Sequence, residues 1–176
     1  MSGHNKWSKI KRQKGASDAK KAKAFSKMAR AIATASRQVH GDTTSPVLRT
    51  AIEKAREFNM PNDNIERAVK KGVGTEAEHL DNITYEAYGP GGSALIIEAL
   101  TSNRNKAAQE IKFILSEHGT SLAAQGSAAW AFAKEGAEWK PTMTTPLSPE
   151  DEAALEKLID ALEENDEVQD VYTNAE

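Results

Sequence analysis

The amino-acid sequence predicts an α+β protein: an N-terminal three-helix domain followed by a ferredoxin-like β-α-β-β-α-β domain with an extra N-terminal hairpin strand. Up to residue 72, apolar residues recur at spacings of three and four, which is the helical period. After residue 83, short β-branched and aromatic runs alternate with two longer helical patterns. The expected boundaries are 1–75 for a basic arm and the helices, 76–82 for a linker and 83–176 for the α+β domain.

Three helices are expected in the first domain, each marked by an apolar face and by boundary residues. The first covers residues 19–39 and places apolar side chains on one face. A Ser-Pro pair at residues 45–46 begins the second helix, which should end near Asn59. Asp63 begins a short third helix as part of a motif that resembles a capping box, and Gly72 is expected to close it.

In the second domain the expected strands and helices are separated by turn or capping residues. In chain order they are strands over 83–88 and 93–100, a helix capped by Ser102 or Asn103 and reaching His118, strands over 128–132 and 138–143, a helix beginning at Ser148, and a strand over 168–173. From residue 93 onward this order is β-α-β-β-α-β, and the strand over 83–88 is the additional one.

Basic charge is concentrated at the N-terminus of a chain that is acidic overall. The first 40 residues hold eleven Lys or Arg and one acid, Asp18, whereas the whole chain has a formal charge of −3. This segregation is typical of an arm that binds a polyanion, attached to an acidic body. A solvated basic tail, or a Lys-rich helix face kept for solubility, is the alternative interpretation.

The candidate nucleic-acid-binding residues form three groups. They are Lys6, Trp7, Lys9, Lys11, Arg12 and Lys14 in the arm; Lys20, Lys23, Lys27, Arg30 and Arg37 on the first helix, opposite its apolar face; and Arg104 and Lys106 at a helix N-terminus. Lys and Arg arrays bind phosphates with little sequence preference. Trp7 could stack on a base or anchor the arm to the body. Arg104 and Lys106 could bind an anion at the start of their helix. The alternative is that the helix is simply capped there and that the arginine is exposed to solvent.

The sequence shows no pattern that indicates an enzymatic activity, a metal site, a cofactor or a small-molecule substrate, and none of these is expected. The four histidines are scattered and match no metal-ligand spacing, and cysteine is absent. The glycine-rich stretch at residues 89–92 precedes a strand and lacks the lysine of a phosphate loop, so a hairpin turn is expected. No apolar run approaches the roughly 20 residues that cross a bilayer, and a cytoplasmic location is expected.

Aromatic residues in the second half raise one further alternative. Tyr85, Trp130, Phe132 and Trp139 could form a base-stacking platform on a ferredoxin-like sheet, as in RNA-recognition domains. The Lys/Arg-Gly-Phe/Tyr run of those domains is missing, and this half of the chain is acidic. Core packing of Trp130 and Phe132 is therefore the preferred expectation.

Four motifs in order along the chain together resemble one family, the YebC-type proteins. They are Gly3-His4-Asn5-Lys6-Trp7, Met60-Pro61-Asn62-Asp63, Tyr85-Glu86-Ala87-Tyr88-Gly89-Pro90-Gly91-Gly92 and Leu100-Thr101-Ser102-Asn103-Arg104-Asn105. The resemblance implies a helical N-terminal domain and two α+β domains. Its bacterial members are described as probable transcriptional regulators that bind DNA, and its mitochondrial members act as translational activators. This chain departs from the pattern because the additional domain that usually follows the strand around Phe132 is missing.

The sequence therefore predicts a non-enzymatic regulatory protein that binds nucleic acid, with a DNA-binding transcriptional regulator as the first hypothesis. A ribosome-associated translation factor that contacts rRNA through the same basic region is the alternative, since DNA and rRNA present the same phosphates. A third hypothesis is a protein-interaction module that acts through the acidic C-terminal helix. The expected partner is DNA or RNA, with the ribosome as the alternative to DNA, and no association with a membrane is expected.

Overall fold

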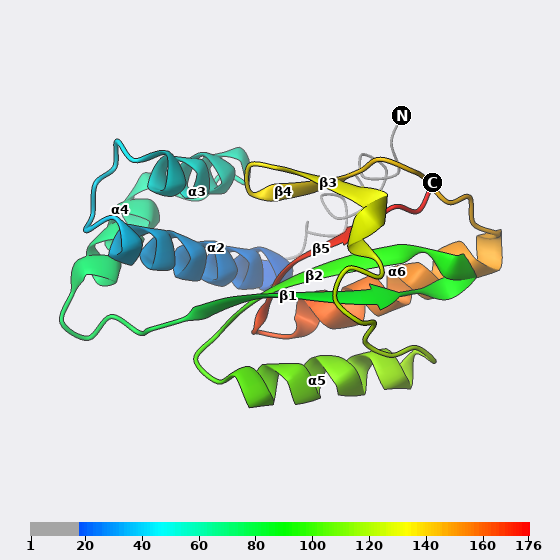
Figure 1. The fold of residues 1–176 in the computed structure, drawn as a ribbon. Coiled ribbons are helices and arrows are strands. Elements are labelled where there is room, and N and C mark those ends of the chain that lie inside the picture. Colours follow the sequence, from blue (N-terminus) through cyan, green and yellow to red (C-terminus); the bar gives the residue numbers. More distant parts are fainter. Residues whose placement is uncertain (1–17) are drawn as a thin grey trace. The chain divides into compact units, whose positions relative to one another are not determined.

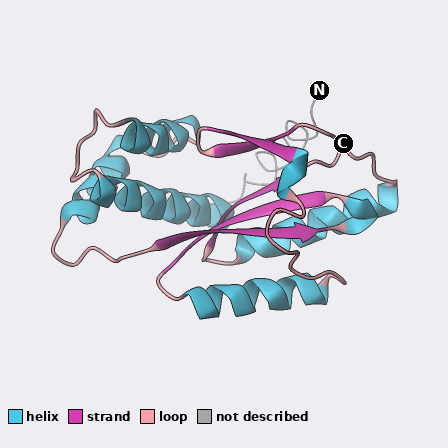
Figure 2. Cartoon of the chain, viewed as in Figure 1, coloured by secondary structure: helices cyan, strands magenta, loops and turns pink. Residues whose placement is uncertain are grey.

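The computed structural model describes residues 18–176, which divide into two compact units, one ending at Leu80 and the other beginning at Asp81. The first unit contains helices and no strand among its described residues, whereas the second combines strands with helices (Figures 1 and 2). The predicted α+β class is confirmed.

The helical unit consists of α2 (Asp18–Gln38), α3 (Pro46–Glu57) and α4 (Asn62–Val73). Each helix is amphipathic, and the apolar faces of the three meet in one core that includes the fully buried Ile32 and Leu48. Partly buried side chains of α2, among them Phe25, pack against this core. The predicted apolar face of the first helix therefore holds the unit together.

Gly72 lies inside α4, where the backbone of α2 approaches closely, so the expectation that it closes the helix is wrong. A Cβ atom on Gly72 would lie 2.3 Å from the carbonyl oxygen of Ala33 and 2.7 Å from the Cβ of Ser36. The Ser36 hydroxyl donates a hydrogen bond of 2.7 Å to the carbonyl of Val69 across the same contact. The capping expectation is also corrected, because Pro61 occupies the N-cap of α4 and Asp63 lies in its first turn.

The second unit follows the predicted order of strands and helices. Its elements are β1 (Asp81–Tyr88), the turn η1 (Pro90–Gly92), β2 (Ala94–Thr101), α5 (Arg104–Glu117), the turn η2 (Ala129–Ala131), β3 (Phe132–Glu135), β4 (Glu138–Pro141), α6 (Pro149–Glu164) and β5 (Val168–Thr173). Of the two predicted caps of α5, Asn103 is the one that accepts a hydrogen bond, from the backbone N–H of Lys106. Ser148, where the last helix was expected to begin, caps α6 by accepting from the N–H of Asp151.

The pairing of these strands differs from a ferredoxin-like sheet. One antiparallel sheet has the order β1-β2-β5, and β3 and β4 form a separate two-stranded sheet. Gly91 and Gly92, both at positive φ, turn β1 directly back onto β2, so that β1 occupies one edge of β2 while β5 occupies the other. Neither edge of β2 then remains for the β3–β4 hairpin.

The central strand β2 is buried on both faces, which explains its almost uninterrupted apolar sequence. Leu95 and Ile97 face α5 and α6 and contribute to one core cluster. Ala94 and Ile96 point to the opposite face, where the β3 residue Phe132 packs in a second cluster. The helices thus cover one face of the sheet, and η2 with the β3–β4 hairpin covers the other.

Candidate nucleic-acid interface

The arm residues and the α2 residues differ in what the structure says about them. Lys6, Trp7, Lys9, Lys11, Arg12 and Lys14 lie outside the described residues. On α2, Lys20 and Arg37 are exposed, whereas Lys23, Lys27 and Arg30 are half-buried. The Arg37 guanidinium donates a hydrogen bond of 2.5 Å to the carbonyl oxygen of Ala77. Part of the predicted basic face therefore also contributes to the packing of its own unit.

Arg104 and Lys106 lie close together in sequence at the start of α5, but each faces carboxylates. The Nε atom of Arg104 lies 3.1 Å from an Asp81 oxygen. The Lys106 Nζ lies 3.4 Å from Glu167 and 3.7 Å from Glu110. The hydrogen bond to Glu167, with further attraction from both acids, raises the pKa of Lys106. A phosphate arriving here would have to compete with three carboxylates.

Further cations lie on α3 and α4, which the sequence interpretation did not select. The exposed ones are Arg49, Arg56, Arg67, Lys70 and Lys71. Several stand in the last turn of a helix, where positive charge also stabilises the helix dipole. The signal that could have found them is the charge of the whole helical unit. Residues 18–80 hold twelve basic and eight acidic side chains, whereas residues 81–176 hold six and eighteen.

The aromatic side chains of the second unit do not form an open base-stacking platform. Phe132, the first residue of the β3–β4 hairpin, is buried against the face of the sheet that such a platform would need. Trp139 is half-buried, and its indole N–H donates to Glu98 at 2.7 Å. Trp130 is 58% exposed, and its indole N–H donates to the Tyr88 hydroxyl at 3.0 Å. The preferred expectation of core packing thus holds for Phe132 and is wrong for Trp130.

The motif at residues 85–92 organises a neighbouring loop. The carboxylate of the buried Glu86 accepts hydrogen bonds from the backbone N–H groups of Gly126, Ala128 and Ala129, at 2.6, 2.9 and 2.6 Å. The Tyr88 hydroxyl donates to the carbonyl of Ser127. These contacts explain why residues 128–131 form a turn instead of the predicted strand, since the N–H groups of Ala128 and Ala129 bind the carboxylate and that of Ala131 donates to the carbonyl of Ala128.

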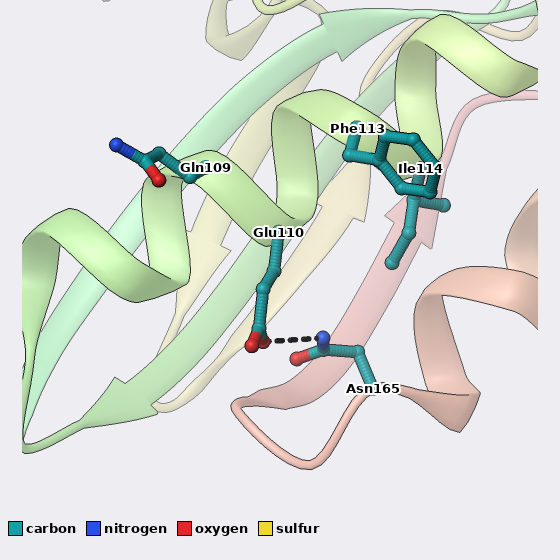
Figure 3. A pocket seen from close by; sticks show the side chains of 5 residues that line it. All are labelled: Gln109, Glu110, Phe113, Ile114 and Asn165. Atoms are coloured by element: carbon teal, nitrogen blue, oxygen red, sulfur yellow. Dashed lines mark hydrogen bonds between the residues drawn. The ribbon is translucent and has the colours of Figure 1, made fainter.

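Two hollows open on the surface of the second unit. One, of about 300 Å³, lies beside α5 and is lined by Gln109, Glu110, Phe113, Ile114 and Asn165 (Figure 3). Glu110 accepts a hydrogen bond of 2.8 Å from the Asn165 amide at its edge. The other, of about 450 Å³, runs along β1. Within the described range, no three His, Cys, Asp or Glu side chains are placed to hold a metal ion.

Among the helices of residues 18–176, none combines the length and the apolar character needed to cross a bilayer.

Comparison with family models decides the relationship of the chain to known proteins. Residues 5–75 match the model described as the TACO1/YebC protein N-terminal domain, and residues 80–137 and 134–175 match the one described as the TACO1/YebC second and third domain. The chain belongs to the TACO1/YebC family. The resemblance inferred from the four sequence motifs is therefore confirmed.

Individual members of the family cover nearly the whole chain. A protein from Fervidobacterium nodosum is 40% identical over 99% of this chain and 93% of its own length. A protein from Thermoanaerobacter pseudethanolicus is 39% identical over 100% of this chain and 97% of its own length. Both carry the name probable transcriptional regulatory protein. The crystal structure of a conserved hypothetical protein from Aquifex aeolicus has a TM-score of 0.77, with 31% identity over 90% of this chain and 91% of that one.

The same comparisons show that this TACO1/YebC chain is a short form. The alignment with the Fervidobacterium protein has 235 positions against 176 residues here, so at least 59 positions have no counterpart in this chain. The family model is matched by two segments that overlap at residues 134–137, which form the end of β3 and the turn of the β3–β4 hairpin. A short hairpin therefore stands where the relatives carry additional chain.

Proposed function

We propose that this TACO1/YebC chain is a non-enzymatic regulatory protein that binds DNA through its N-terminal arm and the basic side chains of α2. The observation that supports the proposal is the separation of charge along the sequence. Up to Leu80 the chain has seventeen basic and eight acidic residues, and from Asp81 onward it has six and eighteen. A polyanion is attracted to the first part and repelled by the second.

The proposed contact surface consists of the arm cations, Lys20, Lys23, Lys27 and Arg30. Arg37 contributes less, because its guanidinium already holds the carbonyl of Ala77. Arg104 and Lys106 are left out of the surface, because their neighbouring carboxylates make that part of the second unit unfavourable for phosphate. Contacts of this kind go to the phosphate backbone, so the proposed binding discriminates little between base sequences.

DNA is the preferred partner because the relatives are named probable transcriptional regulatory proteins. Ribosomal RNA presents the same phosphates, and the same cations would serve a translation factor. Binding to a DNA duplex and co-sedimentation with ribosomes, both measured at matched salt, separate the two functions. If the protein co-sediments with ribosomes and binds the DNA duplex more weakly, its partner is rRNA and not DNA.

The salt dependence of binding tests the contact surface. A variant in which Lys9, Lys11, Arg12 and Lys14 are all replaced by alanine should bind a DNA duplex more weakly. The slope of log K against log salt should become shallower by up to about four, close to one for each lost phosphate contact. Titration by fluorescence anisotropy at several salt concentrations measures this slope.

A matched control removes the same number of charges from the second unit, by replacing the exposed residues Lys112, Lys134, Lys140 and Lys157 with alanine. This control should keep the slope of the unmodified protein, although its net charge equals that of the arm variant. An arm variant with an unchanged slope, or a control with an equally reduced one, would show that the arm is not the contact surface.

A further inference from the structure

We propose that the outer edge of β1, around Asn82 and Thr84, binds an extended basic peptide segment of another protein, which adds a strand to the sheet. The strand order β1-β2-β5 places β1 at one edge, as Figure 1 also shows. This surface belongs to the acidic unit, so the proposal is independent of the nucleic-acid binding proposed above.

Half of this edge is already paired within the chain. Ala87 forms an antiparallel bridge with Leu122, and the backbone N–H of Ala123 donates to the carbonyl of Glu86 at 2.8 Å. Backbone groups in a strand point alternately to its two sides, so the groups of Thr84 and Asn82 face outward as the Glu86 carbonyl does. In the described part of the chain, no backbone hydrogen bond reaches the outward groups of these two residues.

The buried carboxylate of Glu86 keeps the rest of the edge open. Continued antiparallel pairing beyond Ala123 would place the following residues beside Thr84. The chain turns away instead, because Gly126, Ala128 and Ala129 donate their N–H groups to the Glu86 side chain. A pairing register is thus established at one end of the edge, and none of residues 18–176 continues it along a hollow of about 450 Å³.

The lining of this hollow indicates the side chains that an added strand would carry. Tyr85 packs against the core cluster beneath α5 and α6, and Ile83 lies on the same side of β1 by alternation. Leu122 lines the hollow as well. Asn82 and Thr84 are exposed on the opposite side. A segment with alternating apolar and polar residues therefore fits the edge.

The negative charge of residues 81–176 favours a basic segment as the added strand. Residues 81–176 include eighteen acidic and six basic side chains, and this net negative charge attracts cationic partners. On the polar side of β1, the carboxylate of Glu98 accepts the Thr84 hydroxyl at 2.9 and 3.0 Å and lies next to the open edge. Arg104 stands at one end of the hollow, where Asp81 balances its charge. We therefore assign the edge to an extended segment in which lysine or arginine alternates with apolar residues.

The experiment uses the full chain and a capped, fluorescent six-residue peptide of alternating lysine and valine. Two peptides serve as controls: one carries N-methyl groups on alternate residues, and one has glutamate in place of lysine. Thr84→Pro removes the outward N–H and adds a ring at the edge, while the ladder to β2, which uses the inward groups, remains. Thr84→Val keeps the backbone donor. Anisotropy titrations should show binding about tenfold weaker for Thr84→Pro and little changed for Thr84→Val.

Amide hydrogen exchange in the unmodified protein gives a second readout that needs no variant. Saturation with the lysine–valine peptide should slow exchange at Asn82 and Thr84, whereas the N-methylated peptide should not. Unchanged exchange at both residues overturns the proposal, as does equal binding of the N-methylated or the glutamate peptide. If the protein forms a dimer without peptide, and Thr84→Pro abolishes that dimer, the edge binds a second copy of the chain instead. If Thr84→Pro fails to fold, the exchange measurement alone decides.

Discussion

Replacing Glu86 by glutamine tests the role of its carboxylate in the second unit. One carboxylate oxygen accepts from Ala128 and Ala129, and the other accepts from Gly126 at 2.6 Å. A glutamine amide keeps one acceptor oxygen, but its NH₂ group would face a backbone N–H, so one hydrogen bond is lost. A hydrogen bond to a charged group contributes about 1.5–3 kcal/mol, and the two that remain weaken by about 1 kcal/mol each when the charge is removed.

The expected loss is therefore about 3–5 kcal/mol in the free energy of unfolding of the second unit. For a domain of this size that corresponds to a fall in Tm of more than about 12 °C. Glu98→Gln is the matched control, because Glu98 in the same sheet as Glu86 also accepts hydrogen bonds, from the Thr84 hydroxyl and from the indole of Trp139 in the β3–β4 hairpin. A hydroxyl can rotate to accept from the new amide, so this change should cost about 1 kcal/mol.

Urea denaturation measures both variants, followed by the fluorescence of Trp130 and Trp139, which lie in this unit. Hydrogen exchange at Gly126, Ala128 and Ala129 should accelerate in Glu86→Gln and stay unchanged in Glu98→Gln. A Glu86→Gln protein as stable as Glu98→Gln, with unaltered exchange at the three amides, would refute the reasoning.

Two further predictions concern packing and pH. Gly72→Ala should destabilise the helical unit by about 1–3 kcal/mol, because its Cβ would overlap the α2 backbone. Gly74→Ala, whose Cβ would lie 3.5 Å from its nearest neighbour, should cost less, and thermal unfolding compares the two. Burial raises the pKa of Tyr172 above its ordinary value of 10.0. Its stabilising contribution is therefore complete below pH 10 and lost above it, so Tyr172→Phe should flatten the alkaline loss of stability measured by urea titration.

Local features of the fold could be predicted from the sequence. Asn103 and Ser148 cap their helices as expected, because capping depends on a side chain and an N–H group three residues apart. The bounds of β5, Val168–Thr173, also agree with the prediction. Gly72 was misinterpreted, because its role depends on Ala33 and Ser36, which belong to another helix.

In the candidate site, too, some features could be predicted from the sequence and others could not. The charge of the arm and of α2 is a matter of composition and could be recognised directly. The acids that neutralise Arg104 and Lys106 could not, because Asp81 and Glu167 lie 23 and 61 residues away in sequence. Only folding brings them within reach, so the ion pairs of Arg104 and Lys106 could not be predicted from the sequence.

The sequence by itself determined the family, the order of helices and strands and the separation of basic from acidic charge, since each depends on residue identity and short spacings. The tertiary structure decided which strands pair, where Glu86 directs its carboxylate and which strands form the edges of the sheet. These features depend on contacts between residues far apart in the chain, and no local pattern specifies them. Two short strands expected in the sheet formed their own hairpin because β1 and β5 already occupied both edges of β2.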